Sequence, residues 1–193
     1  YEIKPAHFAV YNSSGLHIER YWKLHSKKHT DSFGTTCSKV EYLLHDAITR
    51  QLVSDVPLCT FLSGGLDSSI ITKFAADYCQ KEGLPPLDTY SIDYVDNDKN
   101  FVKSDFQPNS DNYYINLMNR DLHTNHHQIV IDTPELAEYL EDAMVARDMP
   151  GMADIDSSLL LFCKNVKKEM TVSLTGECAD EIFGGYPWFF RED

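Results

Sequence analysis

A short apolar run followed by a turn rich in serine and glycine places the strongest constraint on how this chain folds. Residues 57–62 are mostly apolar, and residues 70–79 repeat apolar side chains at the spacing of a helix. The seven residues between them read Ser63-Gly64-Gly65-Leu66-Asp67-Ser68-Ser69. A strand, a tight turn and a helix in this order are the building block of a parallel sheet. The chain is therefore expected to have an α/β fold.

The later part of the chain continues the alternation of strands and helices. Further strands are expected at residues 87–94, 127–131 and 170–174, and a further helix at residues 155–168. Together these elements predict a Rossmann-like parallel sheet with helices on both faces, in which ligands bind beyond the carboxyl ends of the strands. The polar residues 96–112 are expected to form a long surface loop.

Two helix starts are predicted from their capping residues. An amphipathic helix is expected to begin at Ser38, because Ser38 and Glu41 have the spacing of a capping box and apolar residues then recur at steps of three and four. Another helix is expected after Thr133 as its N-cap, with Pro134 in the first helical position. The apolar face of this second helix consists of Leu136, Ala137, Leu140 and Met144.

The first 24 residues have a different pattern. Residues 7–11 and 16–22 surround the turn Asn12-Ser13-Ser14-Gly15, which predicts a β-hairpin. The chain begins with Tyr1 rather than Met, and no basic flank precedes an apolar run near that end. We therefore expect an excised fragment without a signal peptide.

The charge balance and the cysteines argue against several classes of protein. The formal net charge is -13, from 17 basic and 30 acidic side chains, and such a surface repels a nucleic-acid backbone. No apolar run approaches the roughly eighteen residues that a membrane-spanning helix needs. The odd number and wide spacing of the cysteines indicate reduced thiols in a cytoplasmic protein; they are Cys37, Cys59, Cys79, Cys163 and Cys178.

The serine- and glycine-rich turn has the composition of an anion site. Gly64 and Gly65 allow backbone N–H groups to approach a phosphate, serine hydroxyls add donors, and the following helix directs its positive N-terminus to the same point. The turn lacks both the lysine-containing loop of common NTPases and the dinucleotide-binding glycine pattern. Asp67 can lie beside phosphates only with a cation between them, and Mg2+ is suited to that place. We therefore expect a pyrophosphate site with a bound metal ion.

The turn is similar to the signature loop of the N-type ATP pyrophosphatases, which have an adenine nucleotide alpha hydrolase-like fold. These enzymes cleave ATP between the α- and β-phosphates and form an acyl adenylate. A second motif resembles the asparagine synthetase pattern SGEGxDExFGGY; it reads Thr175-Gly176-Glu177-Cys178-Ala179-Asp180-Glu181-Ile182-Phe183-Gly184-Gly185-Tyr186. Both motifs follow strands of the predicted sheet, so we expect them to converge on one crevice.

The resemblance to asparagine synthetases, which extends over nearly the whole chain, implies roles for particular residues. Those that bind ATP and its pyrophosphate would be Ser63, Gly64, Gly65, Leu66, Asp67, Ser68, Ser69, Ser91, Tyr94, Thr175, Gly176 and Asp180. Asp67 and Asp180 would bind Mg2+, and Glu177 would be the catalytic general base when ammonia attacks. Thr175, Cys178 and Ala179 replace the Ser, Gly and Ser of the family, which affects the geometry of the loop rather than the class of enzyme.

The activity implied by the resemblance is glutamine-dependent asparagine synthesis by a carbon–nitrogen ligase. Mg-ATP would adenylate the aspartate side chain, and ammonia from glutamine would displace AMP. Residues 1–34 would be the tail of a preceding glutaminase domain with a linker, and residues 35–193 a synthetase domain truncated at its C-terminus. The isolated fragment is expected to be inactive. A homodimer is considered, and neither nucleic acid nor a membrane is an expected partner.

Two other interpretations stay open. A different N-type ATP pyrophosphatase, such as a beta-lactam synthetase-like ligase, shares the first loop, and the second motif argues against it less firmly than against NAD or GMP synthetases. A nucleotide-binding regulatory module without catalysis is the other, although Asp67, Glu177 and Asp180 are all present. His126 and His127 are expected to have a structural role.

Overall fold

The computed structural model describes residues 2–102 and 110–189. Part of the predicted surface loop, residues 103–109, lies outside the described residues. The chain divides into two compact units, Tyr1–Val40 and Glu41–Asp193.

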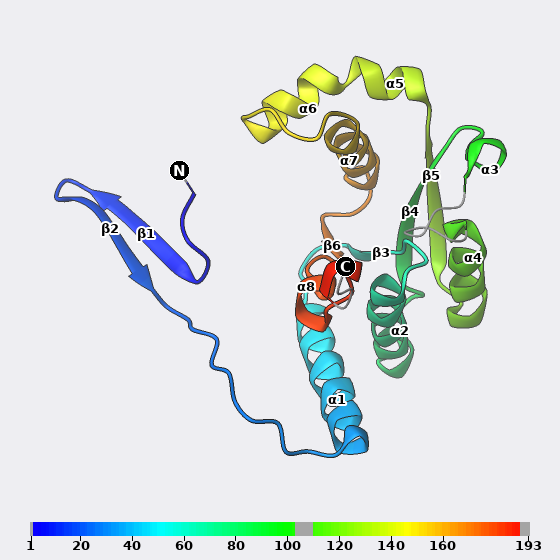
Figure 1. Cartoon of the computed structure of the whole chain (residues 1–193). Coiled ribbons are helices and arrows are strands. Elements are labelled where there is room, and N and C mark those ends of the chain that lie inside the picture. The colour runs from blue at the N-terminus through cyan, green and yellow to red at the C-terminus, as the bar shows by residue number, and fades with distance from the viewer. Residues whose placement is uncertain (1, 103–109, 190–193) are drawn as a thin grey trace. The chain divides into compact units, whose positions relative to one another are not determined.

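The first unit contains the predicted hairpin. Strands β1 (His7–Asn12) and β2 (Gly15–Arg20) are antiparallel, with Asn12 opposite Gly15 at the turn (Figure 1). Ser14 donates two hydrogen bonds to the side-chain oxygen of Asn12, from its backbone N–H at 2.9 Å and from its hydroxyl at 2.5 Å. The hairpin expected from the Asn-Ser-Ser-Gly turn is confirmed, although β2 ends at Arg20 rather than at residue 22.

The second unit is built on a four-stranded sheet in which all strands are parallel. The strands β3 (Leu58–Phe61), β4 (Asp88–Tyr94), β5 (Asn125–Ile131) and β6 (Val172–Leu174) lie in the order β5-β4-β3-β6. Cys59 of β3 is opposite Asp88 on one side and Ser173 on the other. Because β3 and β6 are neighbours that run in the same direction, the two loops that follow them leave the same edge of the sheet.

Helices cover both faces of this sheet (Figure 1). On one face lie α2 (Leu66–Lys81) and α4 (Asp111–Leu122), and on the other lies α7 (Ala153–Val166) with α5 (Thr133–Glu138) and α6 (Leu140–Arg147) packed on it. The predicted α/β fold, a parallel sheet with helices on both faces, is confirmed. No helix in the described part of the chain is long and apolar enough to cross a membrane.

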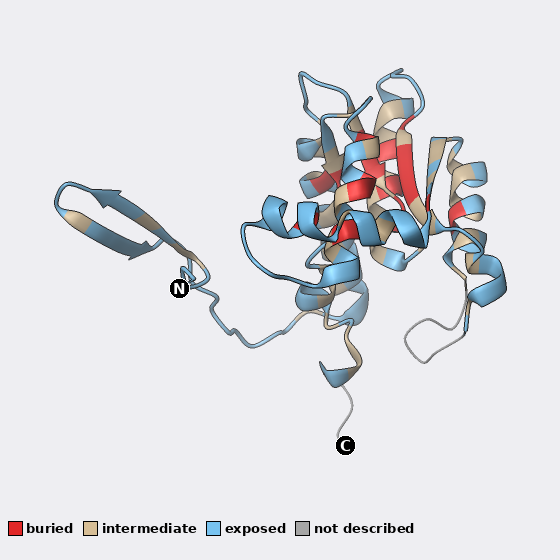
Figure 2. Cartoon of the chain, turned by 90° about the horizontal axis from the view of Figure 1, so that it is seen from above, coloured by how far each residue is buried: buried red, intermediate tan, exposed pale blue. Residues whose placement is uncertain are grey.

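Each face of the sheet has its own core. Figure 2 shows buried residues gathered on the strands and on the inner sides of the helices. Beneath α7 the core consists of Cys59, Tyr90, Phe162 and Val166, and beneath α2 it consists of Ala75, Ala76 and Leu87. The α2 face also carries two fully buried hydroxyls, Thr60 of β3 and Thr72 of α2, whose Oγ1 atoms are 3.0 Å apart. Each hydroxyl thus has the partner that a buried polar group needs.

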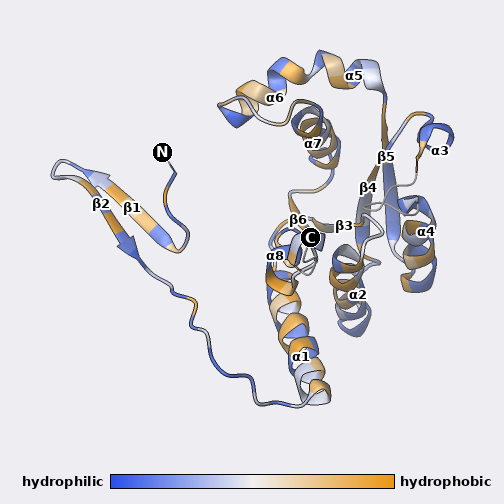
Figure 3. Cartoon of the chain, viewed as in Figure 1, coloured by the Kyte–Doolittle hydropathy of each residue, from blue (hydrophilic) through white to orange (hydrophobic). Residues whose placement is uncertain are grey.

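The first long helix begins earlier than its capping pattern predicts. Helix α1 covers Phe33–Gln51, so the expected start at Ser38 with Glu41 is wrong. Ser32 provides the cap instead, because its hydroxyl accepts a hydrogen bond from the backbone N–H of Thr35 at 3.2 Å. Figure 3 shows the mixture of apolar and polar residues along α1 that is typical of an amphipathic helix.

Helix α2 also begins earlier, at Leu66 rather than at residue 70. Gly65 is its N-cap, with the extended conformation φ -71°, ψ 166°. Asp67 and Ser68 therefore lie in the first turn of a helix, where backbone N–H groups have no partner within the helix.

The segment between β4 and β5 is more helical than the sequence predicts. A short helix α3 (Asn97–Asn100) and the start of α4 at Asp111 interrupt the expected loop, and α4 itself was not predicted. Its apolar positions, among them Ile115 and Leu122, have helical spacing, but asparagines and an arginine between them obscure the pattern.

The helix predicted after Thr133 is divided in two. Thr133 is the first residue of α5 and Asp132 is the N-cap, so the expected N-cap is wrong by one residue. The division between α5 and α6 occurs at Tyr139, whose ring lies under the Lys164 ammonium of α7 at 4.3 Å. The break accompanies a contact with another helix, which local periodicity does not predict.

Candidate functional site

The first loop leaves the carboxyl end of β3 and enters α2. Its shape depends on Ser68, a buried residue whose hydroxyl lies 3.0 Å from the Ser63 hydroxyl. The same oxygen accepts a hydrogen bond from the Ser63 backbone N–H and donates one to the Gly65 carbonyl, each at 3.2 Å. The loop is therefore tied to the first turn of its own helix, whose N-terminus carries a partial positive charge.

Gly64 is the point at which this loop meets α4. Its φ is +80°, which side chains disfavour. A Cβ on Gly64 would lie 2.8 Å from the carbonyl oxygen of Asp111 and 3.3 Å from Ile115, both in α4. Only glycine fits here, so the first turn of α4 supports the loop from behind.

The second loop follows β6 and touches the first. A Cβ on Gly176 would lie 3.1 Å from the Cβ of Asp67 and 3.3 Å from the backbone nitrogen of Ser68. The loop continues through Glu177 and Cys178 into the short helix α8 (Ala179–Phe183). The two motifs predicted to converge are thus in contact at the N-terminus of α2.

The carboxylates of Asp67 and Asp180 lie near each other at this contact. Burial and, to a smaller extent, the negative charge of Asp180 raise the pKa of Asp67 above its usual value. Neither carboxylate has an ion pair with a described Lys, Arg or His, and no cluster of three or more metal-ligand side chains occurs among the described residues. A divalent cation suits this arrangement, because it would offset two neighbouring negative charges and take its other ligands from phosphate and water.

Ser91 and Tyr94 of β4 do not join this contact through their hydroxyl groups. Ser91 is 3% exposed and its hydroxyl lies 3.0 Å from Nε2 of His126. The Tyr94 hydroxyl lies 2.6 Å from the Ser158 hydroxyl in α7. The two side chains thus point to opposite faces of the sheet, and their expected contact with the nucleotide stays a prediction.

A family model described as asparagine synthase matches residues 39–193, which include both loops and the whole sheet. The chain belongs to the asparagine synthase family.

Two relatives show how much of such a protein is present. The chain is 58% identical over 192 residues to the glutamine-hydrolyzing asparagine synthetase 3 of Bacillus subtilis strain 168, a match that covers 100% of this chain and 31% of that protein. It is 27% identical over 170 residues to the glutamine-hydrolyzing asparagine synthetase B of Escherichia coli K12, which covers 81% of this chain and 28% of that protein. The chain spans about a third of the length of these curated relatives.

One solved structure is similar at the level of general architecture. An NH3-dependent NAD synthetase from Campylobacter jejuni has a TM-score of 0.40 and 11% sequence identity, over 81% of this chain and 62% of that chain. A likeness of this degree adds nothing to what the sheet itself shows.

Cys178 occupies the position of the second glycine in the asparagine synthetase motif, and its backbone has a conformation that favours glycine. Its φ is +69°, in the left-handed region that a residue with a Cβ adopts at a cost. Cys178 is exposed and is the N-cap of α8. The loop thus holds a residue with a Cβ in a conformation that suits glycine better.

The candidate general base, Glu177, is an exposed residue of the second loop, between β6 and α8. Its backbone N–H donates to the Thr175 hydroxyl at 3.4 Å. Farther along, the Tyr186 hydroxyl donates to Glu181 at 2.9 Å, and this bond raises the pKa of Tyr186. Because Glu177 is exposed, its side chain is accessible to a small substrate.

The histidine pair on β5 makes contacts within the sheet. His126 has Thr89 Oγ1 2.8 Å from Nδ1 and Ser91 Oγ 3.0 Å from Nε2, and burial, with a smaller contribution from His127, lowers its pKa. His127 lies 2.8 Å from Asp88 and stacks on Tyr90 with ring centres 4.5 Å apart. These contacts are consistent with the structural role that was expected for both residues.

Asp93 belongs to the end of β4, residues 91–94, which was expected to hold adenine and ribose, and its carboxylate accepts four hydrogen bonds. The donors are the backbone N–H of Tyr94 and the side-chain amides of Asn97, Asn112 and Gln128. Tyr94 and Asn97 are near Asp93 in the sequence, whereas Asn112 and Gln128 are 19 and 35 residues away. No local motif indicates that these two distant residues join the cluster.

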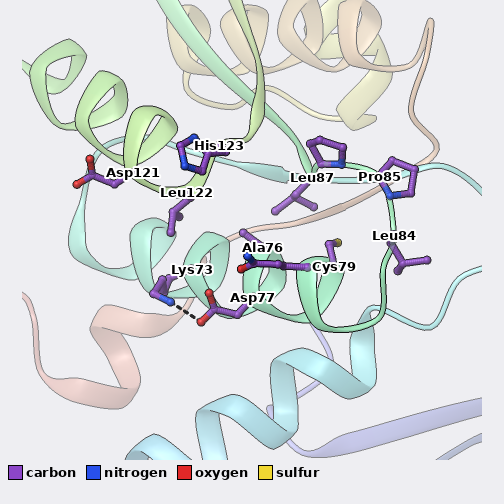
Figure 4. Close-up of a pocket in the computed structure, with 12 residues that line it drawn as sticks. Lys73, Ala76, Asp77, Cys79, Leu84, Pro85, Leu87, Asp121, Leu122 and His123 are labelled. Carbon is purple, nitrogen blue, oxygen red and sulfur yellow. Dashed lines mark hydrogen bonds and ion pairs between the residues drawn. The ribbon is translucent and has the colours of Figure 1, made fainter.

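A cavity of about 580 Å3 lies away from the two loops. It is bounded by the C-terminal half of α2, the α2–β4 connection and the end of α4, with the ion pair of Lys73 and Asp77 at its side (Figure 4). None of the candidate site residues lines it. It is therefore distinct from the contact between the two motifs.

Proposed function

We propose that the parent protein makes asparagine: it uses Mg-ATP to adenylate the side-chain carboxylate of aspartate, and ammonia from glutamine then displaces AMP. The observation that carries the proposal is the contact of Gly176 with Asp67 and Ser68. It brings a carboxylate pair, a glycine-rich loop and a helix N-terminus to one point, in a chain that belongs to the asparagine synthase family.

In the first step, the residues of the first loop bind the pyrophosphate part of ATP. Backbone N–H groups of Gly64, Gly65 and the first turn of α2 donate to phosphate oxygens, and the Ser69 hydroxyl adds a donor. Asp67 and Asp180 would hold Mg2+, which would supply positive charge to offset the charge of the leaving pyrophosphate. The Ser68 hydroxyl already holds the loop together, so we assign it to shaping the site as well as to binding.

The adenosine part would lie along the ends of β4 and β6. Because the hydroxyls of Ser91 and Tyr94 are engaged by His126 and Ser158, backbone groups at the end of β4 are the available contacts for adenine and ribose. Thr175 and Gly176, at the end of β6, would approach the nucleotide from the other side.

In the second step, Glu177 accepts a proton as ammonia attacks the adenylated carboxylate. Its exposed side chain is free to approach such a substrate, and it adjoins Gly176 at the contact of the two loops. The β1–β2 hairpin would be the last part of a glutaminase domain, which would supply the ammonia in the cytoplasm. We assign residues 1–34 to that domain and its linker, and residues 35–193 to the synthetase domain.

The test is aspartate-dependent exchange of labelled pyrophosphate into ATP, with Mg2+, on the parent protein at its natural length. Exchange should require aspartate and should disappear in Asp67→Ala. Asp98→Ala, which removes an exposed carboxylate from α3, should leave it unchanged and serves as the matched control.

The same assay separates the alternatives. Exchange with another carboxylic acid but not with aspartate would identify a related ligase, such as a beta-lactam synthetase-like enzyme. Nucleotide binding without exchange for any acid would identify a regulatory module and overturn the proposed reaction.

A further inference from the structure

The carboxylate of Asp93 lies where four segments of the chain meet at the carboxyl edge of the sheet. Its Oδ1 accepts hydrogen bonds from the Tyr94 backbone N–H at 2.9 Å and from Asn97 Nδ2 at 2.7 Å. Its Oδ2 accepts from Asn112 Nδ2 at 2.7 Å and from Gln128 Nε2 at 3.2 Å. One carboxylate thus joins the end of β4 to α3, α4 and β5.

All the donors to Asp93 are uncharged amides. None of the ion pairs between described residues includes Asp93. Burial by itself would raise the pKa of this carboxyl, but the hydrogen bonds from Asn112, Asn97 and the Tyr94 backbone together lower it, so the group stays charged at neutral pH. Hydrogen bonds to a charged acceptor are stronger than those between neutral groups. The cluster is therefore a firm connection.

Asn112 extends this connection to the first loop. It is the second residue of α4, and its Oδ1 also accepts a hydrogen bond from Gln128 at 3.1 Å. The residue before it, Asp111, presents the carbonyl oxygen that would lie 2.8 Å from a Cβ on Gly64. Asp93 thus holds the very turn of α4 that supports the loop glycine.

We propose that Asp93 is a positioning residue of the nucleotide site: it fixes the distance between the end of β4 and the Ser63–Ser69 loop by holding the first turn of α4 through Asn112. The proposal rests on the proposed function for its kinetic consequence, since the end of β4 would carry the adenosine part of ATP and the loop its pyrophosphate. The side chain itself touches neither substrate nor metal in this scheme. Its effect on the reaction passes through α4.

The kinetic test uses the parent protein with Asp93→Ala, Asn112→Ala and the double variant in the pyrophosphate-exchange assay. The KM for ATP should rise about tenfold in each single variant, because each breaks the charge-assisted hydrogen bond between Asp93 and Asn112 that holds α4, with the KM for aspartate unchanged. The double variant should be no worse than the single variants, because both substitutions break one connection. Asp98→Ala is the matched control and should behave as the parent protein does.

A conservative variant separates positioning from a direct role of the charge. Asp93→Asn keeps one acceptor oxygen for the Tyr94 N–H and Asn97 and places an NH2 donor where Oδ2 was. The amides of Asn112 and Gln128 can turn their oxygens toward that donor, so the KM for ATP should return to within about threefold of the parent value. If Asp93→Asn were as defective as Asp93→Ala, the charge itself would be needed and the positioning role would be overturned. Additive effects in the double variant would overturn it as well.

A second measurement needs neither nucleotide nor turnover. Backbone hydrogen exchange of residues 63–66 and 111–114 should be faster in Asp93→Ala than in Asp98→Ala. The two variants are compared under conditions that give them the same free energy of unfolding. This outcome would support the connection even if the parent protein showed no pyrophosphate exchange, a failure that would count against the proposed function alone. Unchanged exchange at residues 63–66 would overturn the inference.

Discussion

Gly176 lies against Asp67 so closely that a methyl group on the glycine would stand 3.1 Å from the Asp67 Cβ and 3.3 Å from the Ser68 backbone nitrogen. Neither atom can move by a side-chain rotation, because the Asp67 Cβ is fixed to the backbone and the Ser68 nitrogen is part of the backbone in the first turn of α2. The contact therefore sets the distance between the two loops.

Gly176→Ala should displace the loops by a few tenths of an ångström and lower pyrophosphate exchange by roughly tenfold, since a misplacement of about 1 Å costs on the order of 100-fold. The measurement is the exchange rate of the parent protein at saturating ATP. Gly34→Ala, a helical position with nothing within 4 Å of the new methyl group, is the matched control and should exchange normally. Normal exchange in Gly176→Ala would show that the loops tolerate separation.

Gly64→Ala should destabilise the fold more than other substitutions of a left-handed glycine. Gly83 also has a positive φ, +66°, but no atom lies within 4 Å of its Cβ position, so Gly83→Ala measures the backbone cost alone, about 1 to 2 kcal/mol. Gly64→Ala adds the collision with the Asp111 carbonyl and should lose at least about 1 kcal/mol more in urea unfolding. Equal losses would mean that α4 yields to the new methyl group at no cost.

Cys178→Gly should stabilise the protein by about 1 kcal/mol, because glycine adopts φ +69° without the penalty that a Cβ brings. Cys178→Ala keeps the Cβ and should give no such gain, which separates the backbone effect from loss of the thiol. Urea unfolding of both variants tests the idea. A gain in both would assign the effect to the sulfur instead.

The free energy of unfolding should fall as the pH drops below about 6.5, the ordinary pKa of histidine, because of His126. Burial lowers its pKa in the folded protein, so between that lowered pKa and the ordinary one the unfolded chain binds the additional proton. The contribution of neutral His126 is therefore complete above pH 6.5 and is lost as the pH falls.

The pH dependence can be assigned by substitution. Denaturation of His126→Gln from pH 8 to pH 5 should show a shallower loss than the parent chain, while His25→Gln, at an exposed position, should follow the parent curve. The same slope in all three proteins would place the titration elsewhere.

Asp67→Asn should leave stability in the absence of ligand within about 0.5 kcal/mol of the parent protein or slightly above it, since burial and Asp180 both disfavour the charged carboxylate. Addition of Mg-ATP should raise the melting temperature of the parent protein and not that of the variant, because ligand binding stabilises only the form that binds. Thermal melts with Mg-ATP, and with ATP and a chelator, test the metal role. An equal rise in both proteins would remove Asp67 from the metal site.

The parallel sheet and the convergence of its two motifs could be predicted because both depend on local signals. An apolar run before Ser63 marks a strand, and the direction of parallel strands then brings the two loops to one edge. The starts of α1 and α2 were harder to predict from the sequence, because the N-caps are Ser32 and Gly65 rather than the serines nearest the apolar pattern. Capping is decided by backbone conformation, which several nearby residues could adopt.

The part of the site that was not predicted depends on contacts between distant segments. Nothing near Asp93 indicates that Asn112 and Gln128 will meet it, and Ser91 gave no sign that His126 would engage its hydroxyl. Such pairings follow from the register of β4 and β5 and from the position of α4, which only the folded chain determines.

The hydroxyl pair of Thr60 and Thr72 has a consequence for how accurately Asp67 is placed. Were α2 to slide along β3, both hydroxyls would be left in a dry interior without partners, at a cost of roughly 1 to 3 kcal/mol for each. The hydroxyl pair therefore fixes the position of α2 along β3. Asp67 lies in the first turn of α2, so its position relative to the sheet is fixed as well. The position of the Asp67 carboxylate thus depends on two buried threonines, and a substitution of either one should broaden the range of positions that the carboxylate samples.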